Sequence, residues 1–328
     1  MSSNKKNIYI FLSKVVLITL LIVLIIRTFF IESFTVSSSQ MEDTLYENDK
    51  ILIDKTAYGI RLPITVLSIP FTFDNIGGFK SYSSLLQLPY IRLFASQVQQ
   101  NDIVLFNNPT ETDKPLDKRE LLLCRCVALP DDMIEMKQGS FFVNSKLYEP
   151  SPNSINEYWT QYKQVDELKS IAEDSDISIK DTRQAGDTVF LGLDKYNSFL
   201  LNEYLPDSLS LSLKADTTVN YQFSIPSKGK TIELNEQNIA IYGQVILQES
   251  INKDIRIERG KLVIEGVEQK SYTFQDDYYW LASDNNINST DSYTLGFIPF
   301  SSVIGKVRSI WYNPGKELRT DRCFKQVK

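Results

Sequence analysis

The chain has 328 residues, of which 42% are hydrophobic and 23% charged, and its formal net charge is -6. Such an acidic balance excludes the basic surface by which proteins bind phosphate backbones, so we expect no nucleic-acid partner. The sequence contains no histidine, which excludes Ser/His/Asp triads, Cys/His dyads and zinc sites built on imidazole. We expect no metal and no other cofactor.

An apolar segment opens the chain. The run 8–26 carries only three polar side chains, Ser13, Lys14 and Thr19, and a helix of this length can cross the core of a bilayer. A cleaved signal peptide is the alternative, but its apolar core would be shorter and would end in small residues. Bulky residues follow the run instead, which favours an uncleaved transmembrane anchor over 8–30.

The charges around this segment predict its orientation. Lys5 and Lys6 precede it, Lys14 can extend its ammonium group towards the same side, and only Arg27 follows closely. The positive-inside rule therefore places residues 1–7 in the cytoplasm as a short tail. The body then lies on the exterior or periplasmic face of the cytoplasmic membrane, with lipid around the single anchor.

Beyond the anchor, short apolar runs separated by turn residues predict strands more often than helices. One helix is expected over 158–173, where apolar residues recur every three positions. An Asn-Ser pair at 144–145 predicts a tight hairpin between two short runs. Many short strands with few helices predict a mainly β body. The strands are expected at 50–53, 55–58, 101–106, 121–129, 231–234 and 261–265, with further short strands between 188 and 267.

The three cysteines are Cys124, Cys126 and Cys323. Cys124 and Cys126 are two positions apart and no second pair exists, so their spacing fits no common metal site. On a strand both side chains point to the same face, and a disulfide between them would be strained. We expect both to be small apolar fillers of the core.

Four clusters of polar and turn residues occur along the body. The first follows the anchor, and the third contains the two neighbouring cysteines. In chain order they are Ser37-Ser38-Ser39-Gln40-Met41-Glu42-Asp43-Thr44-Leu45 with Asn48-Asp49, then Asn101-Asp102-Ile103-Val104-Leu105-Phe106, then Cys124-Arg125-Cys126-Val127-Ala128-Leu129-Pro130-Asp131-Asp132, and finally Ser283-Asp284-Asn285-Asn286-Ile287-Asn288-Ser289-Thr290-Asp291-Ser292.

These clusters resemble, in the same order, the motifs of the type I signal peptidase (leader peptidase) family. Its members are membrane-anchored Ser/Lys endopeptidases that remove signal peptides from exported proteins. The resemblance covers residues 1–150 and 255–315. It implies a signal-peptidase-like β-fold core over 31–150 and 255–315, an inserted, variable second domain over 151–254 and a C-terminal tail over 316–328.

The resemblance also shows where this chain departs from the family. The family's nucleophile is the Ser before the Met of the first motif, a position occupied here by Gln40. Its general base is the Lys that opens the third motif, where this chain has Cys124. An amide cannot form an ester intermediate, and a thiol without a neighbouring base keeps a pKa of roughly 8.5 or higher. No intact catalytic residue is therefore expected, and a Cys124 nucleophile is disfavoured.

Two supporting positions of the family keep their hydroxyl groups. Ser38 stands where the resemblance places an oxyanion-hole hydroxyl, and Ser289 where it places a hydroxyl that orients the Lys. The family binds substrate as an extra β-strand beside the first motif, which requires backbone edges but no nucleophile. We expect Gln40, Met41 and Cys124 to face such a peptide groove.

These observations favour a catalytically inactive homologue, a pseudoenzyme. Its expected partners are signal peptides or exported preproteins, or else an active signal peptidase or translocation component. Two alternatives stay open. One is an active signal peptidase I with a non-standard site, and the other is an anchored β-rich domain whose motifs are coincidental.

Overall fold

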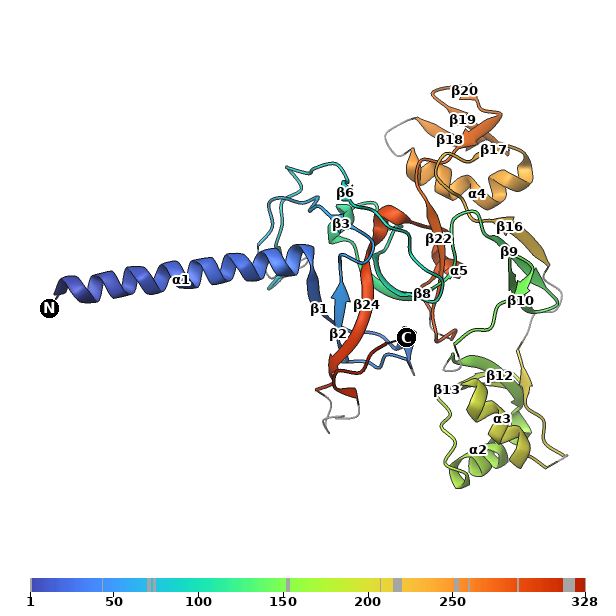
Figure 1. Ribbon diagram of the computed structural model, residues 1–328. Coiled ribbons are helices and arrows are strands. Elements are labelled where there is room, and N and C mark those ends of the chain that lie inside the picture. The colour runs from blue at the N-terminus through green and yellow to red at the C-terminus, as the bar shows by residue number, and fades with distance from the viewer. Residues whose placement is uncertain are drawn as a thin grey trace.

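The computed structural model shows a mainly β body carried on one long N-terminal helix (Figure 1). The fold class expected from the sequence is therefore confirmed. The structure describes residues 2–42, 44–69, 72, 75–151, 154–206, 208–214, 220–250, 254–258, 260–287, 289–314 and 322–327.

Helix α1 (Ser2–Phe29) extends away from the body (Figure 1). Its stretch Tyr9–Phe29 is long and apolar enough to span a membrane, and none of it is buried against the protein. The predicted anchor is thus a helix of sufficient length whose apolar side chains suit lipid better than water. The helix leads directly into strand β1 (Ile31–Thr35), where Glu32 pairs with both Arg27 at 2.8 Å and Lys55 at 2.6 Å.

The body is built on an antiparallel sheet of seven strands. Its central strand β7 (Ile103–Asn107) is buried along its whole length, because alternate residues enter two different apolar cores. Ile103 and Leu105 pack in one core, and Val104 and Phe106 in the other. The remaining strands are β1, β2 (Lys50–Asp54), β24 (Val303–Tyr312), β8 (Leu121–Ala128), β22 (Tyr278–Ala282) and β23 (Ile298–Pro299), in the order β1-β2-β24-β7-β8-β22-β23.

A second sheet and a helical cap lie beside β22 (Figure 1). Helix α4 (Glu236–Glu249) packs into the same apolar core as Val127, Ile134 and Trp280. The sheet has the order β11-β10-β9-β16, and two small sheets pair β17 with β21 and β18 with β19 and β20. Their bounds are β9 (Met133–Lys137), β10 (Ser140–Val143), β11 (Lys146–Leu147), β16 (Tyr221–Ser224), β17 (Thr231–Glu233), β18 (Ile255–Glu258), β19 (Lys261–Ile264), β20 (Val267–Glu268) and β21 (Ser271–Thr273).

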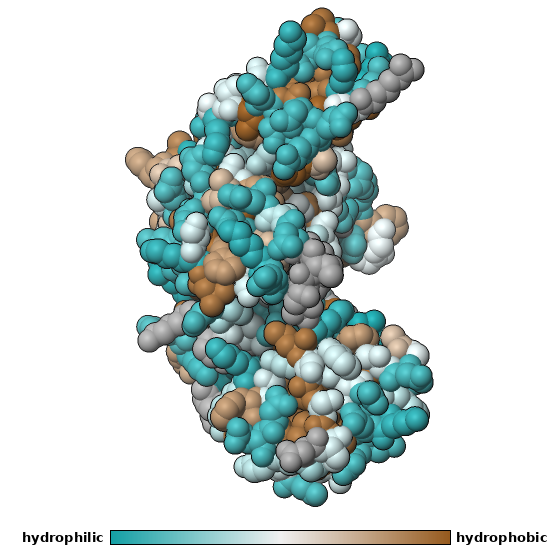
Figure 2. Space-filling model, turned by 90° about the vertical axis from the view of Figure 1, so that its right-hand side faces the viewer, coloured by the Kyte–Doolittle hydropathy of each residue, from teal (hydrophilic) through white to brown (hydrophobic). Residues whose placement is uncertain are grey.

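A separate lobe is formed by four strands and two helices, and it lies at the bottom of both Figure 1 and Figure 2. It has its own apolar core, centred on Leu168, Leu191 and Leu201. Residues of the predicted insertion 151–254 therefore fall into two groups, because β16, β17 and α4 belong to the other part of the body. The lobe contains β12 (Asn156–Gln161), α2 (Val165–Asp174), β13 (Asp181–Ala185), β14 (Thr188–Leu193), α3 (Lys195–Tyr204) and β15 (Ser212–Leu213).

Short elements complete the part of the chain that the structure describes. Two small strand pairs join β3 with β6 and β4 with β5, and the first of them lies near the body end of α1 (Figure 1). Near the C-terminus, Arg322 packs against the body and pairs with buried Asp49. The elements are β3 (Ile60–Arg61), β4 (Asn75–Ile76), β5 (Phe79–Lys80), β6 (Arg92–Leu93), α5 (Ser292–Leu295) and the 3-10 turns η1 (Ser39–Met41), η2 (Leu116–Lys118), η3 (Tyr162–Gln164) and η4 (Phe300–Ser302).

Two expected elements were wrong in part. The predicted helix over 158–173 begins only at Val165, because the residues before it pair with β14 as strand β12. The predicted strand 55–58 is a turn, in which the carboxylate of Asp54 accepts hydrogen bonds from the backbone N–H groups of Thr56 and Ala57. Helices α3 and α4, between 188 and 267, were not predicted.

The Asn-Ser hairpin was predicted correctly. Asn144 and Ser145 connect β10 to β11 with φ values of 52° and 63°, which is the left-handed backbone that a tight hairpin requires. Cys124 and Cys126 are both free, and both pack in the core with Val104, as expected for two residues on one face of a strand.

Candidate functional site

The first motif forms a turn that is fixed against the fourth motif. Strand β1 ends at Thr35, and the chain then enters the turn η1, which contains Gln40. The backbone N–H of Asn285 donates to the carbonyl oxygen of Gln40 at 3.0 Å, and the Asn285 amide donates to Ser39 O at 3.1 Å. Residues 245 positions apart are thereby held together.

The side chain of Gln40 is buried and fully engaged. Only 5% of the residue is exposed. Its Nε2 lies 3.1 Å from the carbonyl oxygen of Leu123, 3.0 Å from that of Thr290 and 3.4 Å from the sulfur of Cys124. The amide group therefore bridges strand β8 and the fourth motif, and it makes contact with the position of the family's base.

Cys124 lies in the middle of β8 and is completely buried. Besides Gln40, its sulfur is 3.7 Å from Ser283 Oγ and 3.8 Å from Thr290 O. Burial raises the pKa of the Cys124 thiol far above its ordinary value, and the negative charges of Asp291 and Asp284 raise it further. Hydrogen bonds from Ser283 and Gln40 act in the opposite direction but do not offset the burial. The thiol is therefore neutral at physiological pH.

A buried ion pair fixes the third motif to the fourth. Arg125 Nε and Nη2 donate to the two carboxylate oxygens of Asp284 at 2.9 and 2.7 Å, and both side chains are almost fully buried. Thr44 Oγ1 donates to the same carboxylate at 2.6 Å. This two-pronged geometry gives the pair a defined orientation as well as energy. It holds β8, the first motif and the fourth motif in one unit.

Asp291 organises the end of the fourth motif. Its carboxylate caps the short helix α5 by accepting from Tyr293 N at 3.0 Å, and it also accepts from Ser283 N at 3.0 Å. Because Asp291 is fully buried, these bonds satisfy a charge that would otherwise be costly. Segment 283–291 is thus closed into a loop around Cys124.

The remaining predicted site residues lie apart from these contacts. Ser38 is exposed at the start of η1, and Ser289 is half-buried. Neither hydroxyl makes a hydrogen bond to another described residue. Met41 is 1% exposed and packs in a core with Val36, Leu45 and Ile51. That Gln40, Met41 and Cys124 face a peptide groove stays a prediction.

Two contacts of the site were missed from the sequence. Ser283 Oγ and the carbonyl of Thr290 enclose the Cys124 sulfur, whereas the sequence directed attention to Ser289. One signal was available for the first of them, since Ser283 stands where the fourth motif of the family has Gly. A second small polar group close to the base position could have been inferred from that difference.

The chemistry open to this arrangement is limited. An amide, a neutral thiol and two backbone carbonyls meet at its centre, and none of them is a base or an activated nucleophile. Within the described residues, no group of three or more His, Cys, Asp or Glu side chains could hold a metal ion. The contacts at this centre are hydrogen bonds and packing.

Comparison with known proteins places this geometry in a family. The model of the family described as "Signal peptidase, peptidase S26" matches residues 10–209 and 225–312. The match thus includes much of the segment 151–254, which the four motifs had left without a counterpart. It covers the anchor, all four motifs and most of the lobe.

Individual relatives agree with this assignment. Signal peptidase I of Buchnera aphidicola subsp. Baizongia pistaciae is 28% identical over 292 residues, which cover 89% of this chain and 73% of the relative. Signal peptidase I of Helicobacter pylori is 21% identical over 327 residues, with 94% of this chain and 90% of the relative covered. The protein of the same name from Rickettsia prowazekii is 24% identical over 293 residues, with coverage of 89% and 76%. The chain described here belongs to the signal peptidase family, peptidase S26.

Proposed function

We propose that this chain is a catalytically inactive member of the signal peptidase I family that binds signal peptides of exported preproteins. One observation carries the proposal. The amide of Gln40 occupies the nucleophile position and donates to Leu123 O, Thr290 O and Cys124 Sγ, so that the centre of the site is filled by a neutral hydrogen-bonded group. The lone pair of an amide nitrogen is delocalised into its carbonyl group, so this side chain cannot attack a peptide bond.

The thiol of Cys124 does not replace the missing serine. A cysteine attacks as the thiolate, and burial keeps this thiol protonated. The side chain is 0% exposed, so a scissile carbonyl could not reach the sulfur without displacing Gln40. None of the described groups in contact with the sulfur is a base, because Ser283 and Thr290 contribute only a hydroxyl and a carbonyl and Gln40 contributes an amide.

The backbone beside Gln40 supports peptide binding. Ser38 has an extended conformation, with φ of -142° and ψ of 160°, and both Ser37 and Ser38 are exposed. Among the described residues, no backbone hydrogen bond satisfies these two positions. An extended peptide can add to such an edge as a strand, with main-chain hydrogen bonds supplying affinity. Binding of this kind requires neither a nucleophile nor a base.

The test uses the full-length chain in detergent and a preprotein with a known cleavage site. We expect a saturable change in anisotropy with a fluorescent signal peptide and no cleavage of the preprotein over hours. Ser38→Pro should weaken binding, because proline removes one backbone donor and blocks strand pairing. If the parent chain cleaves the preprotein, and Gln40→Ala or Cys124→Ala abolishes that cleavage, the proposal is overturned in favour of an active enzyme with a non-standard site.

We also propose the orientation of the anchor. Lys5 and Lys6 precede the apolar stretch Tyr9–Phe29 of α1 and Lys14 lies near the start of that stretch, whereas Arg27 alone lies at its far end, which favours a cytoplasmic N-terminus and an exported body. Proteinase K added to intact spheroplasts should therefore degrade the body. Protection of the body in intact spheroplasts, with degradation after lysis, would show the opposite orientation.

A further inference from the structure

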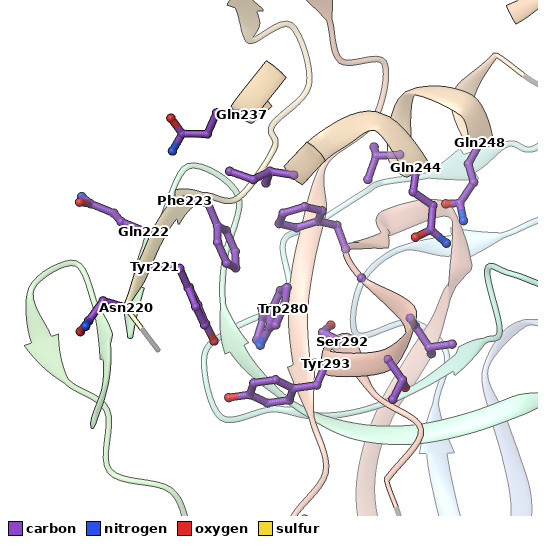
Figure 3. A pocket seen from close by; sticks show the side chains of 16 residues that line it. Asn220, Tyr221, Gln222, Phe223, Gln237, Gln244, Gln248, Trp280, Ser292 and Tyr293 are labelled. Atoms are coloured by element: carbon purple, nitrogen blue, oxygen red, sulfur yellow. The ribbon is translucent and has the colours of Figure 1, made fainter. Parts of the chain in front are cut away.

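A second concave site lies beside α5, the helix that follows Thr290. It is a pocket of about 610 Å³ enclosed by α4, β16, β22 and α5 (Figure 3). Its volume is within the range of small-molecule sites, which is roughly 300 to 1,000 Å³. None of the residues that contact Cys124 lines it, so it is distinct from the site around Gln40.

One wall of the pocket is a row of carboxamides. Gln237, Ile241, Gln244 and Gln248 recur along α4 at intervals of four, three and four, so they share one face of the helix. Figure 3 shows Gln244 and Gln248 of α4 at one end of the pocket, and Gln237 of α4 with Gln222 of β16 at the other. No hydrogen bond joins the side chain of any of these glutamines to another described residue. Each amide offers two donors and an acceptor to a ligand.

The opposite wall is aromatic. Tyr221 and Phe223 alternate along β16 and therefore point to the same side, with their rings stacked at 5.6 Å and 15°. Phe223 contacts Trp280 at 5.2 Å, and Trp280 meets Tyr293 edge-on at 5.5 Å and 83°. Figure 3 shows the indole between the rings of Tyr221 and Tyr293. These side chains present flat apolar surface next to the row of amides.

Trp280 carries a poorly satisfied hydrogen-bond donor at this wall. The residue is 7% exposed, and its indole N–H interacts with the Tyr293 hydroxyl but makes no hydrogen bond of ordinary geometry among the described residues. A buried donor that is poorly satisfied destabilises the folded state. A ligand oxygen in the pocket would satisfy it better. The indole N–H thus adds a donor to the groups that this pocket offers to a ligand.

The composition of the pocket selects the chemistry of that occupant. None of its described lining residues is charged, although 23% of the chain is. A charged ligand would lose its hydration there without a counter-charge. The occupant must therefore be neutral, must carry donors and acceptors at high density, and must have flat apolar faces that stack on aromatic rings.

We propose that this pocket binds a neutral oligosaccharide. Pyranose rings have apolar C–H faces for the aromatic wall and hydroxyl groups, each both donor and acceptor, for the carboxamides. A proline-rich peptide would fill the aromatic wall equally well, but its prolines carry no N–H and would leave the glutamine carbonyls unpaired. The proposal does not depend on whether the site around Gln40 cleaves peptides.

The test monitors Trp280 in the full-length chain. Trp159→Phe and Trp311→Phe leave Trp280 as the only tryptophan of the three in the sequence. The chain is held in a detergent without a sugar headgroup and titrated with chitotriose, maltotriose and cellotriose. We expect a saturable fluorescence change with at least one of them, with a dissociation constant on the order of 0.1 to 1 mM.

Variants connect that signal to the pocket. Gln244→Ala combined with Gln248→Ala should weaken binding at least about tenfold, because both side chains are exposed or half-buried on α4 and their loss removes only ligand contacts. Gln184→Ala is the matched control, since Gln184 is exposed on β13 in the separate lobe, and binding should be unchanged.

Three results would overturn the proposal. The first is that none of the three trisaccharides binds, although circular dichroism shows that the chain is folded. The second is that the double glutamine variant binds the sugar as well as the parent chain does. The third is that a proline-rich nonapeptide binds and the sugars do not. Trp280→Phe provides a second variant, which should keep the aromatic wall but weaken sugar binding through the lost N–H; because it removes the fluorophore, its binding is measured by isothermal titration calorimetry beside the parent chain.

Discussion

The amide nitrogen of Gln40 lies 3.4 Å from the sulfur of Cys124, so the two positions that the motif resemblance assigns to the nucleophile and the base are in direct contact. The two side chains complement each other. The longer Gln side chain crosses the site to reach Leu123 O and Thr290 O, and the small Cys leaves room for it. Gln40 and Cys124 therefore form a packed and neutral unit that supports the fold.

Removing the Gln40 amide should destabilise the body. In Gln40→Ala the buried carbonyl of Leu123 and the carbonyl of half-buried Thr290 each lose a donor, and an unsatisfied buried acceptor costs about 1 to 3 kcal/mol. Chemical denaturation followed by near-ultraviolet circular dichroism measures the loss. The exposed-site control Gln184→Ala should change the free energy of unfolding by less than about 0.5 kcal/mol. Equal stability of both variants would contradict the contacts of Gln40.

The buried thiols should resist alkylation. Cys124 and Cys126 are completely buried, whereas Cys323 is half-buried, and alkylating reagents require an accessible thiolate. Iodoacetamide at neutral pH should label Cys323 alone in the folded chain and all three cysteines in urea. Peptide mapping by mass spectrometry identifies the labelled positions. Rapid labelling of native Cys124 would mean that it is an accessible thiolate, contrary to its burial.

The same thiols should make stability fall in alkaline solution. Burial raises the pKa of Cys124 and of Cys126 far above the ordinary value, so in the folded state both stay protonated. Above about pH 8.5 the unfolded chain loses these protons first, and the free energy of unfolding then declines by up to about 1.4 kcal/mol per pH unit for each thiol. Cys124→Ala removes one of these thiols, so it should reduce the decline of the free energy of unfolding by up to about 1.4 kcal/mol per pH unit between roughly pH 8.5 and 10. An unchanged slope would contradict the raised pKa.

Three turns explain why much of the fold could be predicted from the motifs. Asn48, Asn101 and Asp131 stand where the family has Gly, and their φ values are 68°, 72° and 70°. Asn and Asp are the L-residues that enter this left-handed region most readily, so each turn keeps its shape without Gly. The Asp that follows each of them accepts a hydrogen bond from a backbone N–H of the same turn. The N–H of Tyr46 donates to Asp49 at 2.8 Å, that of Gln99 to Asp102 at 3.2 Å, and that of Leu129 to Asp132 at 2.7 Å.

The filling of the site could not be predicted in the same way. Ser283 and Cys124 are 159 positions apart, and only the pairing of β22 with β8 brings them together. Local periodicity also could not separate β12 from α2, because the strand obtains its hydrogen bonds from the distant β14. The pairing of distant strands determines both the contact between Ser283 and Cys124 and the boundary between β12 and α2. A single sequence does not show which distant strands pair.

Breaking the ion pair between the third and fourth motifs should cost more than losing any surface pair. Asp284→Asn leaves Arg125 buried without its full counter-charge, which typically costs about 3 to 5 kcal/mol. Thermal and denaturant unfolding measure the loss. Glu268→Gln is the control, because its pair with Lys261 is half-exposed and is expected to contribute less than about 1 kcal/mol. Similar losses in the two variants would show that Arg125 finds another partner.

Restoring the dyad should restore cleavage only when three positions change together. Gln40→Ser supplies a hydroxyl, and Cys124→Lys supplies an amine whose pKa burial would lower towards neutrality. Ser283 Oγ lies 3.7 Å from the Cys124 sulfur and would obstruct a longer side chain, so Ser283→Gly is needed as well. We expect the triple variant to cleave a preprotein at least about 100-fold faster than the parent chain, with each single variant inert. Cleavage by Gln40→Ser alone at the rate of the triple variant would show that the base lies elsewhere than position 124.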